Sequence, residues 1–217
     1  MSTVTDSPRA KRRLADEYPD RVRPSKLAHA VLTTPNLPRA RGWYLNALAA
    51  KVAFENDKVC FMTYDNEHHR IGLVALTNLV ERPPNSWGLE HLAFSYPTLG
   101  ALLSQFRYLS SQGITPYWAI NHGPTISFYY RDPDGNKIEM DYDVFPTVAE
   151  VDAFFAAGNY EENFMGIIID PEELIAKYEA GVPLGELVHR PKLPPGMTPG
   201  APVEDPAQQQ RTSGPYL

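Results

Sequence analysis

The sequence predicts an α+β protein in which two similar βαβββ modules pair into an open, curved, mixed β-barrel, followed by C-terminal helices. One observation behind this prediction is an order of elements, a strand, a helix and three short strands, that occurs twice along the chain. A second is that His29 and His91 stand at equivalent positions in the first strand of each round. A third is the composition of the 217 residues, 43% hydrophobic and 21% charged, which is typical of globular proteins.

Hydrophobic alternation and turn residues place the elements of both modules. In the first module, the expected strands are 26–34, 51–56, 58–65 and 68–76, with a helix at 37–50. In the second, they are 88–96, 115–120, 125–132 and 136–143, with a helix at 98–113 that has Thr98 as N-cap and Gly113 as C-cap.

Composition divides the chain further. The ends are polar or rich in proline and cannot build a core. Two helices are expected at 148–155 and 171–188, the second with Asp170 as its cap and Pro171 in its first turn. The predicted parts are a flexible arm at 1–25, the paired modules at 26–146 (module 1, 26–80; module 2, 87–145), a helical extension at 147–190 and a proline-rich tail at 191–217.

Bulk properties exclude several classes of function. The net charge of −6 disfavours nucleic acid as a partner, because phosphate binding requires a basic surface. No apolar stretch is long enough to span a membrane, and the basic N-terminus has no apolar segment behind it, so no signal peptide is expected. The single cysteine, Cys60, lies in the apolar run VCFM and is expected to be buried, which suits a cytoplasmic protein.

Two histidines and a glutamate form the candidate metal site. A lone histidine in an apolar strand is usually a packed core residue, and Glu139 alone would be read as solvent-facing. Taken together, however, His29, His91 and Glu139 bring two imidazoles and one carboxylate from three strands. That donor set is typical of non-haem Fe(II) oxygenases, whose metal keeps open positions on one side.

The repeat also shows which ligand is absent. Aligning Ile71-Gly72-Leu73 with Ile138-Glu139-Met140 puts Gly72 where a fourth protein ligand would stand. Glycine has no side chain that can bind a metal, so substrate and dioxygen could approach from that side.

Residues 120–139, which read INHGPTISFYYRDPDGNKIE, resemble the signature of type I extradiol ring-cleaving dioxygenases, members of the vicinal oxygen chelate superfamily. The resemblance covers about 26–145 and implies paired βαβββ modules. It implies that His29, His91 and Glu139 bind Fe(II), which Mn(II) could replace. It also implies that His69, rather than the adjacent His68, is the active-site acid/base, because strand alternation would send the two to opposite faces.

The resemblance assigns two further site residues, His122 near the bound substrate and Tyr129 beside it. A histidine can take a proton near neutral pH, and a histidine or a tyrosine hydroxyl can stabilise negative charge on oxygen. Tyr130 should point into the core, and the turn 132–135 should position the last strand. Five aromatic residues could line a pocket but are at least as well explained as core: Phe61, Trp87, Tyr117, Trp118 and Phe128.

The function implied is Fe(II)-dependent cleavage of a catechol-type aromatic diol with O2, beside the diol, to a 2-hydroxymuconic semialdehyde-type product. A homo-oligomer is expected. One alternative is a metal-dependent isomerase or lyase of the glyoxalase type, which the missing fourth ligand at Gly72 disfavours. Another is a metal-free small-molecule-binding module on the same fold.

Overall fold

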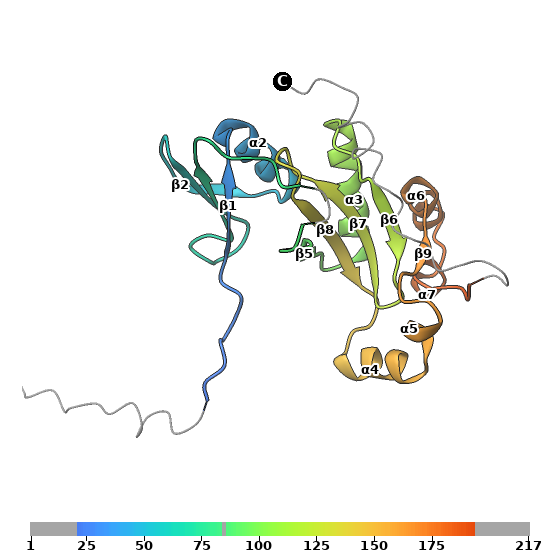
Figure 1. Cartoon of the computed structure of the whole chain (residues 1–217). Coiled ribbons are helices and arrows are strands. Elements are labelled where there is room, and N and C mark those ends of the chain that lie inside the picture. Colours follow the sequence, from blue (N-terminus) through green and yellow to red (C-terminus); the bar gives the residue numbers. More distant parts are fainter. Residues whose placement is uncertain (1–20, 84–85, 194–217) are drawn as a thin grey trace, which may run out of the picture.

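The structure, a computed structural model, describes residues 21–83 and 86–193 and contains two separate mixed sheets flanked by helices (Figure 1). The α+β class and the two βαβββ modules are therefore as predicted. The flexible arm predicted at 1–25 and the tail predicted at 191–217 lie mostly outside the described residues.

The first module forms a four-stranded sheet, here called sheet A, in the order β1-β4-β3-β2. The pair β1–β4 is parallel and the other pairs are antiparallel, with an irregularity in β2 between Val52 and Phe54. Its elements are β1 (Ala30–Thr34), α2 (Leu37–Ala47), β2 (Lys51–Glu55), β3 (Val59–Thr63) and β4 (Ile71–Ala75).

The second module forms a five-stranded sheet, sheet B, in the order β5-β8-β7-β6-β9. Its fifth strand, β9, comes from the C-terminal extension and pairs with β6. The module elements are β5 (Leu92–Ser95), α3 (Leu99–Ser111), β6 (Trp118–Asn121), β7 (Thr125–Arg131) and β8 (Lys137–Asp143). The extension contains α4 (Val148–Ala156), α5 (Asn159–Glu162), β9 (Ile167–Ile168), α6 (Pro171–Glu179) and α7 (Leu184–Leu187).

Each sheet buries one face under the helix of its own module. On sheet A, Cys60 and Leu73 are buried on the α2 side, and on sheet B Phe128 and Met140 are buried on the α3 side. Because strand side chains alternate, the residues between these core positions lie on the opposite face of each sheet. We call these opposite faces the open faces of sheets A and B.

The helices begin where the sequence predicts. The Asn36 side chain accepts a hydrogen bond from the Arg39 amide at the start of α2, and Thr98 accepts one from the Ala101 amide at the start of α3. Gly113 follows α3 with a positive φ of 74°, a conformation that ends a helix and favours glycine.

The two modules meet through their helices and turns, not through their strands. The Gln105 side chain of α3 donates to the carbonyls of Asn46 and Ala47 at 2.9 Å each. The buried Tyr44 hydroxyl of α2 donates to Asp132 Oδ2 at 3.0 Å, in the turn between β7 and β8. In the described residues no strand of one sheet is hydrogen-bonded to a strand of the other, so the predicted barrel is open.

The Asp132–Gly135 turn has the expected positioning role. Asp132 Oδ1 accepts from the amides of Asp134 at 3.0 Å and Asn136 at 2.7 Å, and Gly135 has a φ of 86°. Burial raises the pKa of Asp132, although its hydrogen bonds act in the opposite direction. The turn thus fixes the start of β8 and ties it to α2.

Three sequence predictions need correction. His29 and His91 lie one residue before β1 and β5, not within these strands as predicted, because the first paired residues are Ala30 and Leu92. The helix predicted at 171–188 breaks after Glu179, where Gly181 adopts a φ of 78° and Pro183 follows. The short elements α5 and β9 were not predicted. Among the described residues, no helix is long and apolar enough to cross a membrane.

The buried Tyr44–Asp132 hydrogen bond gives a stability prediction. We expect Tyr44→Phe to lower the free energy of unfolding by about 2 kcal/mol, because it leaves a buried carboxylate short of a donor. Urea denaturation measures the change. As a control, Tyr108→Phe removes an exposed hydroxyl that donates to Asn46 Oδ1 and should cost much less. Equal losses in both variants would contradict the importance of the buried contact.

Candidate active site

His91 and Glu139 meet on the open face of sheet B. Parallel pairing of β5 and β8 sets Ala93 opposite Glu139, and His91, two residues earlier, shares that face. His91 Nε2 lies 2.8 Å from Glu139 Oε2. Glu139 is only 6% exposed, so the structure buries a carboxylate beside an imidazole as the triad hypothesis requires of these two residues.

A second carboxylate orients the His91 ring. Glu90 Oε2 contacts His91 Nδ1, while Glu90 Oε1 contacts Lys137 Nζ. An Nδ1–H that donates to Glu90 leaves the Nε2 lone pair directed at Glu139. Nε2 and the Glu139 carboxylate can then share either a proton or a cation.

His122 and Tyr129 extend the same face. Antiparallel pairing sets Tyr129 opposite Glu139, and its hydroxyl is hydrogen-bonded with that carboxylate. The Tyr129 hydroxyl also lies 3.0 Å from His122 Nε2. The Tyr129 pKa is raised well above its ordinary value, mainly by burial and secondly by the Glu139 charge. The hydroxyl therefore stays protonated. Trp118 stacks on the Tyr129 ring at 4.8 Å between centroids.

The C-terminal extension holds His122 in place. His122 Nδ1 donates a hydrogen bond to the carbonyl of Met165, which can only accept, so in the neutral ring Nε2 carries the lone pair that faces the Tyr129 hydroxyl. Burial lowers the His122 pKa, which favours this neutral form. Arg190 supports the arrangement by donating to the carbonyl of His122 at 3.0 Å.

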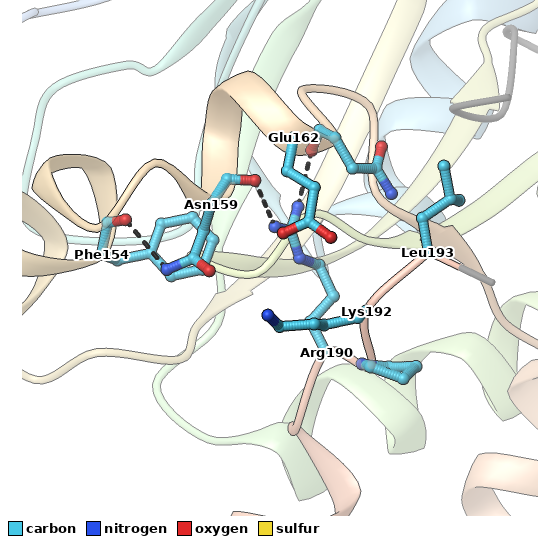
Figure 2. Close-up of a pocket in the computed structure, with 8 residues that line it drawn as sticks. Phe154, Asn159, Glu162, Arg190, Lys192 and Leu193 are labelled. Carbon is cyan, nitrogen blue, oxygen red and sulfur yellow. Dashed lines mark hydrogen bonds between the residues drawn. The ribbon is translucent and has the colours of Figure 1, made fainter. Parts of the chain in front are cut away.

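Figure 2 shows Arg190 inside a small pocket formed by the extension. Its guanidinium donates to the carbonyls of Asn159 and Asn163 at 2.7 Å each and lies over the Phe154 ring. None of the predicted ligands His29, His91 and Glu139 lines this pocket. It therefore acts as a structural clamp on the extension.

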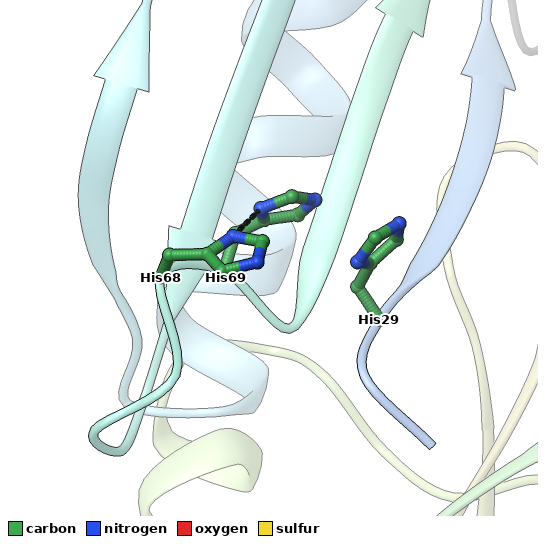
Figure 3. A group of neighbouring side chains, drawn as sticks. All are labelled: His29, His68 and His69. Carbon is green, nitrogen blue, oxygen red and sulfur yellow. Dashed lines mark hydrogen bonds between the residues drawn. The ribbon is translucent and has the colours of Figure 1, made fainter. Parts of the chain in front are cut away.

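His29, His68 and His69 form a separate group beside sheet A (Figure 3). One ring nitrogen from each lies within 4.8 Å of the others. His69 stacks on His29 at 4.2 Å and on Phe61 at 4.6 Å between centroids, and its Nδ1 is 2.6 Å from that of His68. The His69 pKa is lowered, mainly by partial burial and to a smaller extent by the neighbouring His29 and His68.

The prediction that the His68 and His69 side chains point to opposite faces of a strand is wrong. Both rings join the group because these residues lie in a bend before β4, where strand alternation does not apply. His68 is the more exposed of the two.

The structure thus divides the predicted triad between two faces. Among the described residues, His29 has ring contacts with His68 and His69, whereas His91 is paired with Glu139. Gly72 lies on the open face of sheet A, where an added Cβ would stand 3.2 Å from Val31 and 3.4 Å from Phe61. The assignment of His29, His91 and Glu139 as one ligand set stays a prediction.

The aromatic candidates separate into three environments. Phe128 is fully buried against Phe106 beneath sheet B and is core. Trp118 and Tyr117 lie beside Tyr129, and Phe61 lies beside His69, so these three border candidate site residues. Trp87 is 98% exposed, and no contact in the described structure supports a role for it in lining a site.

Sequence reasoning missed several residues that shape the site. Three of them are Glu90, which contacts His91, and Met165 and Arg190, which contact His122. No sequence motif predicts these contacts. Asp141, next to Glu139 on the same face, accepts a hydrogen bond from Ser95, and burial raises its pKa to about 6. The available signal was its position two residues after Glu139, on the same side of β8.

Comparison with known proteins identifies the family. Residues 26–140 match the family described as the Glyoxalase/Bleomycin resistance protein/Dioxygenase superfamily. The chain belongs to this superfamily. It is 42% identical over 167 residues to a Rhodococcus globerulus protein named biphenyl-2,3-diol 1,2-dioxygenase 3, covering 76% of this chain and 88% of that one. The resemblance to extradiol dioxygenases inferred from the signature is confirmed.

The chain is also similar to a second named protein and to a solved structure. A second R. globerulus protein, named biphenyl-2,3-diol 1,2-dioxygenase 2, is 40% identical over 163 residues, covering 75% of this chain and 86% of that one. A solved lactoylglutathione lyase from Agrobacterium tumefaciens aligns with 55% of this chain and 94% of its own, at 17% identity and a TM-score of 0.45, which is too loose to add to the assignment.

The buried His122 predicts a pH-dependent contribution to stability. Burial depresses its pKa below the usual 6.5, so the unfolded chain takes up a proton below pH 6.5 that the folded chain does not. This contribution is present above pH 6.5 and is lost as the pH falls toward the folded-state pKa. We expect the fall in unfolding free energy between pH 7.5 and about 5.5 to be smaller in His122→Gln.

Urea titrations at the two pH values measure this difference. His189→Gln, which changes an exposed histidine outside the modules, serves as the matched control and should retain the wild-type pH dependence. An unchanged pH dependence in His122→Gln would contradict the assigned neutral, buried ring.

Proposed function

We propose that this protein is an Fe(II)-dependent extradiol dioxygenase that opens the ring of a catechol-type diol, such as 2,3-dihydroxybiphenyl or a substituted catechol. The observation that carries the proposal is the convergence of His91, Tyr129 and Glu139 on one face, in a chain about 40% identical to two proteins named biphenyl-2,3-diol dioxygenases.

The donor set fits a divalent metal of the iron type. His91 Nε2 and the Glu139 carboxylate converge at 2.8 Å, and His29 offers a second imidazole on the open face of sheet A. Two imidazoles and a carboxylate suit Fe(II), and Mn(II) would accept the same ligands. When bound by His29, His91 and Glu139, Fe(II) would acidify the catechol hydroxyls and provide an electronic path between the diol and O2.

Tyr129 and His122 supply hydrogen bonding where negative charge develops on the substrate and oxygen atoms. The Tyr129 hydroxyl lies between Glu139 and His122 Nε2, and its raised pKa keeps its proton available for donation. His122 is held by Met165 through Nδ1, so its Nε2 faces the Tyr129 hydroxyl and can accept a hydrogen bond that orients it. Trp118 keeps water from one side of this pair by stacking on Tyr129.

His69 is the acid/base candidate from the other sheet. Its ring is stacked between His29 and Phe61, which places an ionisable nitrogen beside a candidate ligand and beside an aromatic surface. A diol bound near His29 would find there a base able to take a hydroxyl proton and later return it.

The alternatives are less well supported. Gly72 offers no fourth ligand of the kind expected in a glyoxalase-type site, and Val31 and Phe61 border the position. A metal-free binding module gives no reason to bury Glu139 against His91. We also propose a cytoplasmic location, which the buried, unpaired thiol of Cys60 supports.

The test is anaerobic loading of the protein with Fe(II), followed by air and a panel of catechols. We expect a yellow ring-fission product from the wild-type protein. Glu139→Gln should lose both the bound metal and the activity, because a neutral amide is a poor iron ligand. Glu173→Gln, which removes an exposed partner of Lys177, is the matched control and should retain both. Iron binding without product on any diol would refute the reaction.

The acid/base assignment gives a separate prediction. We expect His69→Gln to lower kcat by about 10²-fold or more while leaving bound iron near wild type, because it removes proton transfer and no ligand. His68→Gln, the adjacent and more exposed histidine, should lower kcat far less. Steady-state kinetics with metal analysis on both variants measures this, and a larger loss in His68→Gln would reverse the assignment.

A further inference from the structure

The two candidate histidine ligands lie just outside the strands that follow them. Regular pairing begins at Ala30 in β1 and at Leu92 in β5, one residue after His29 and His91. The strand ladder therefore fixes the chain after each histidine, and the backbone before it needs other partners. Because a metal ligand has to be held within a narrow range of positions, the groups that fix this preceding backbone bear on the site.

Arg70 holds the chain before His29. Its Nη1 donates to the carbonyls of Leu27 at 2.8 Å and Ala28 at 3.0 Å. These hydrogen bonds are charge-assisted, and such bonds are stronger than those between neutral groups. The Ala30 amide, just after the histidine, donates to the backbone carbonyl of Arg70 at 3.0 Å. One residue therefore binds the chain on both sides of His29.

Asp65 fixes the guanidinium of Arg70 in turn. Its Oδ2 accepts from Arg70 Nε at 2.9 Å and from Arg70 Nη2 at 2.8 Å, while its Oδ1 accepts from the Glu67 amide at 2.9 Å. The planar fork of arginine can bind a carboxylate along one edge and carbonyls through its remaining nitrogen, which a lysine ammonium cannot do. The carboxylate thus holds the arginine in the orientation that reaches the two carbonyls.

The second module contains a corresponding contact. Arg82 Nη1 donates at 2.7 Å to the carbonyl of Leu89, which stands two residues before His91. The carbonyl at the same spacing before His29 accepts from the arginine of the first module. Arg82 is itself fixed by Ser86, whose hydroxyl and carbonyl accept from Nε and Nη2 at 2.9 Å each. Both candidate ligands therefore follow a backbone segment that a guanidinium holds.

We propose that Arg70 and Arg82 are positioning residues for the metal ligands, and that each acts through the carbonyl of the leucine two residues before its histidine. A guanidinium has no free lone pair and is not itself a ligand. Its effect is on metal affinity, because a histidine already held in place loses less conformational entropy when the ion binds. This inference deepens the proposed function and rests on its ligand set.

The first test is the Fe(II) dissociation constant of Arg70→Gln and of Arg82→Gln, measured anaerobically by competition with a chelator. We expect each substitution to raise the constant about 10-fold, which is typical for residues that orient metal ligands. Circular dichroism and urea denaturation establish that each variant is folded under the conditions of the titration. An unchanged constant in either variant would overturn the role of that arginine.

The matched control is Arg107→Gln. Arg107 also binds a carboxylate through two nitrogens, that of Glu179, but this exposed pair joins α3 to α6. The substitution removes the same single positive charge, and the iron affinity should stay at the wild-type value. An equal loss of affinity in the control would reveal a general effect of charge and would overturn the positioning role.

Hydrogen exchange on the metal-free protein separates positioning from a general loss of stability. Arg70→Gln should speed exchange in residues 26–34 and leave residues 86–95 at the wild-type rate, and Arg82→Gln should do the reverse. Faster exchange along the whole chain in both variants would overturn the proposal.

A second variant keeps the proposal testable if Arg70→Gln does not fold. Asp65→Asn retains the arginine and removes the charge that anchors it, so it should also weaken iron binding, by less than Arg70→Gln. Wild-type iron affinity in a folded Asp65→Asn would then overturn the role of Arg70.

The iron readout separates this inference from the reaction. Weaker iron binding in both arginine variants, with no catechol opened by the wild-type protein, would leave the positioning role standing and refute the dioxygenase. Ring opening by the wild-type protein, with unchanged iron affinity in both variants, would refute the positioning role alone.

Discussion

The register of β8 between β5 and β7 is the constraint on which the rest of the candidate site depends. Glu139 lies opposite Ala93 on one side and Tyr129 on the other, and its neighbours Ile138 and Met140 are buried toward α3. A slip of one residue would turn Glu139 into the core and an apolar side chain to the open face. The Asp132–Gly135 turn, held by the buried Tyr44 hydroxyl, sets this register at the start of the strand.

Burial of Glu139 carries a desolvation cost that its neighbours offset. A buried carboxylate needs charge and hydrogen bonds, and His91 and Tyr129 provide them. Glu90 contributes indirectly by orienting the His91 ring. These same groups are the ones that we propose bind a metal and move protons. The site is therefore pre-organised on sheet B, with β9 and Arg190 from the extension holding its outer side.

The helix caps and the faces of the strand residues could be predicted from the sequence, because they follow from local periodicity and an internal repeat. Thr98 and Asp170 cap their helices as expected, Tyr130 is core, and Glu139 is on the face that alternation gives it. The contacts of His122 were not readable, since Met165 and Arg190 reach it from distant segments. The shared orientation of His68 and His69 was missed because a bend replaces the strand there.

The central claim is that one metal ion is held by His29, His91 and Glu139. A crystal structure of the anaerobic Fe(II)-loaded protein, with anomalous data collected at the iron absorption edge, tests it most directly. We expect one anomalous peak per chain, from an iron ion bound by His91 Nε2, the Glu139 carboxylate and a His29 imidazole. A peak among His29, His68 and His69, with His91 still paired only to Glu139, would contradict it.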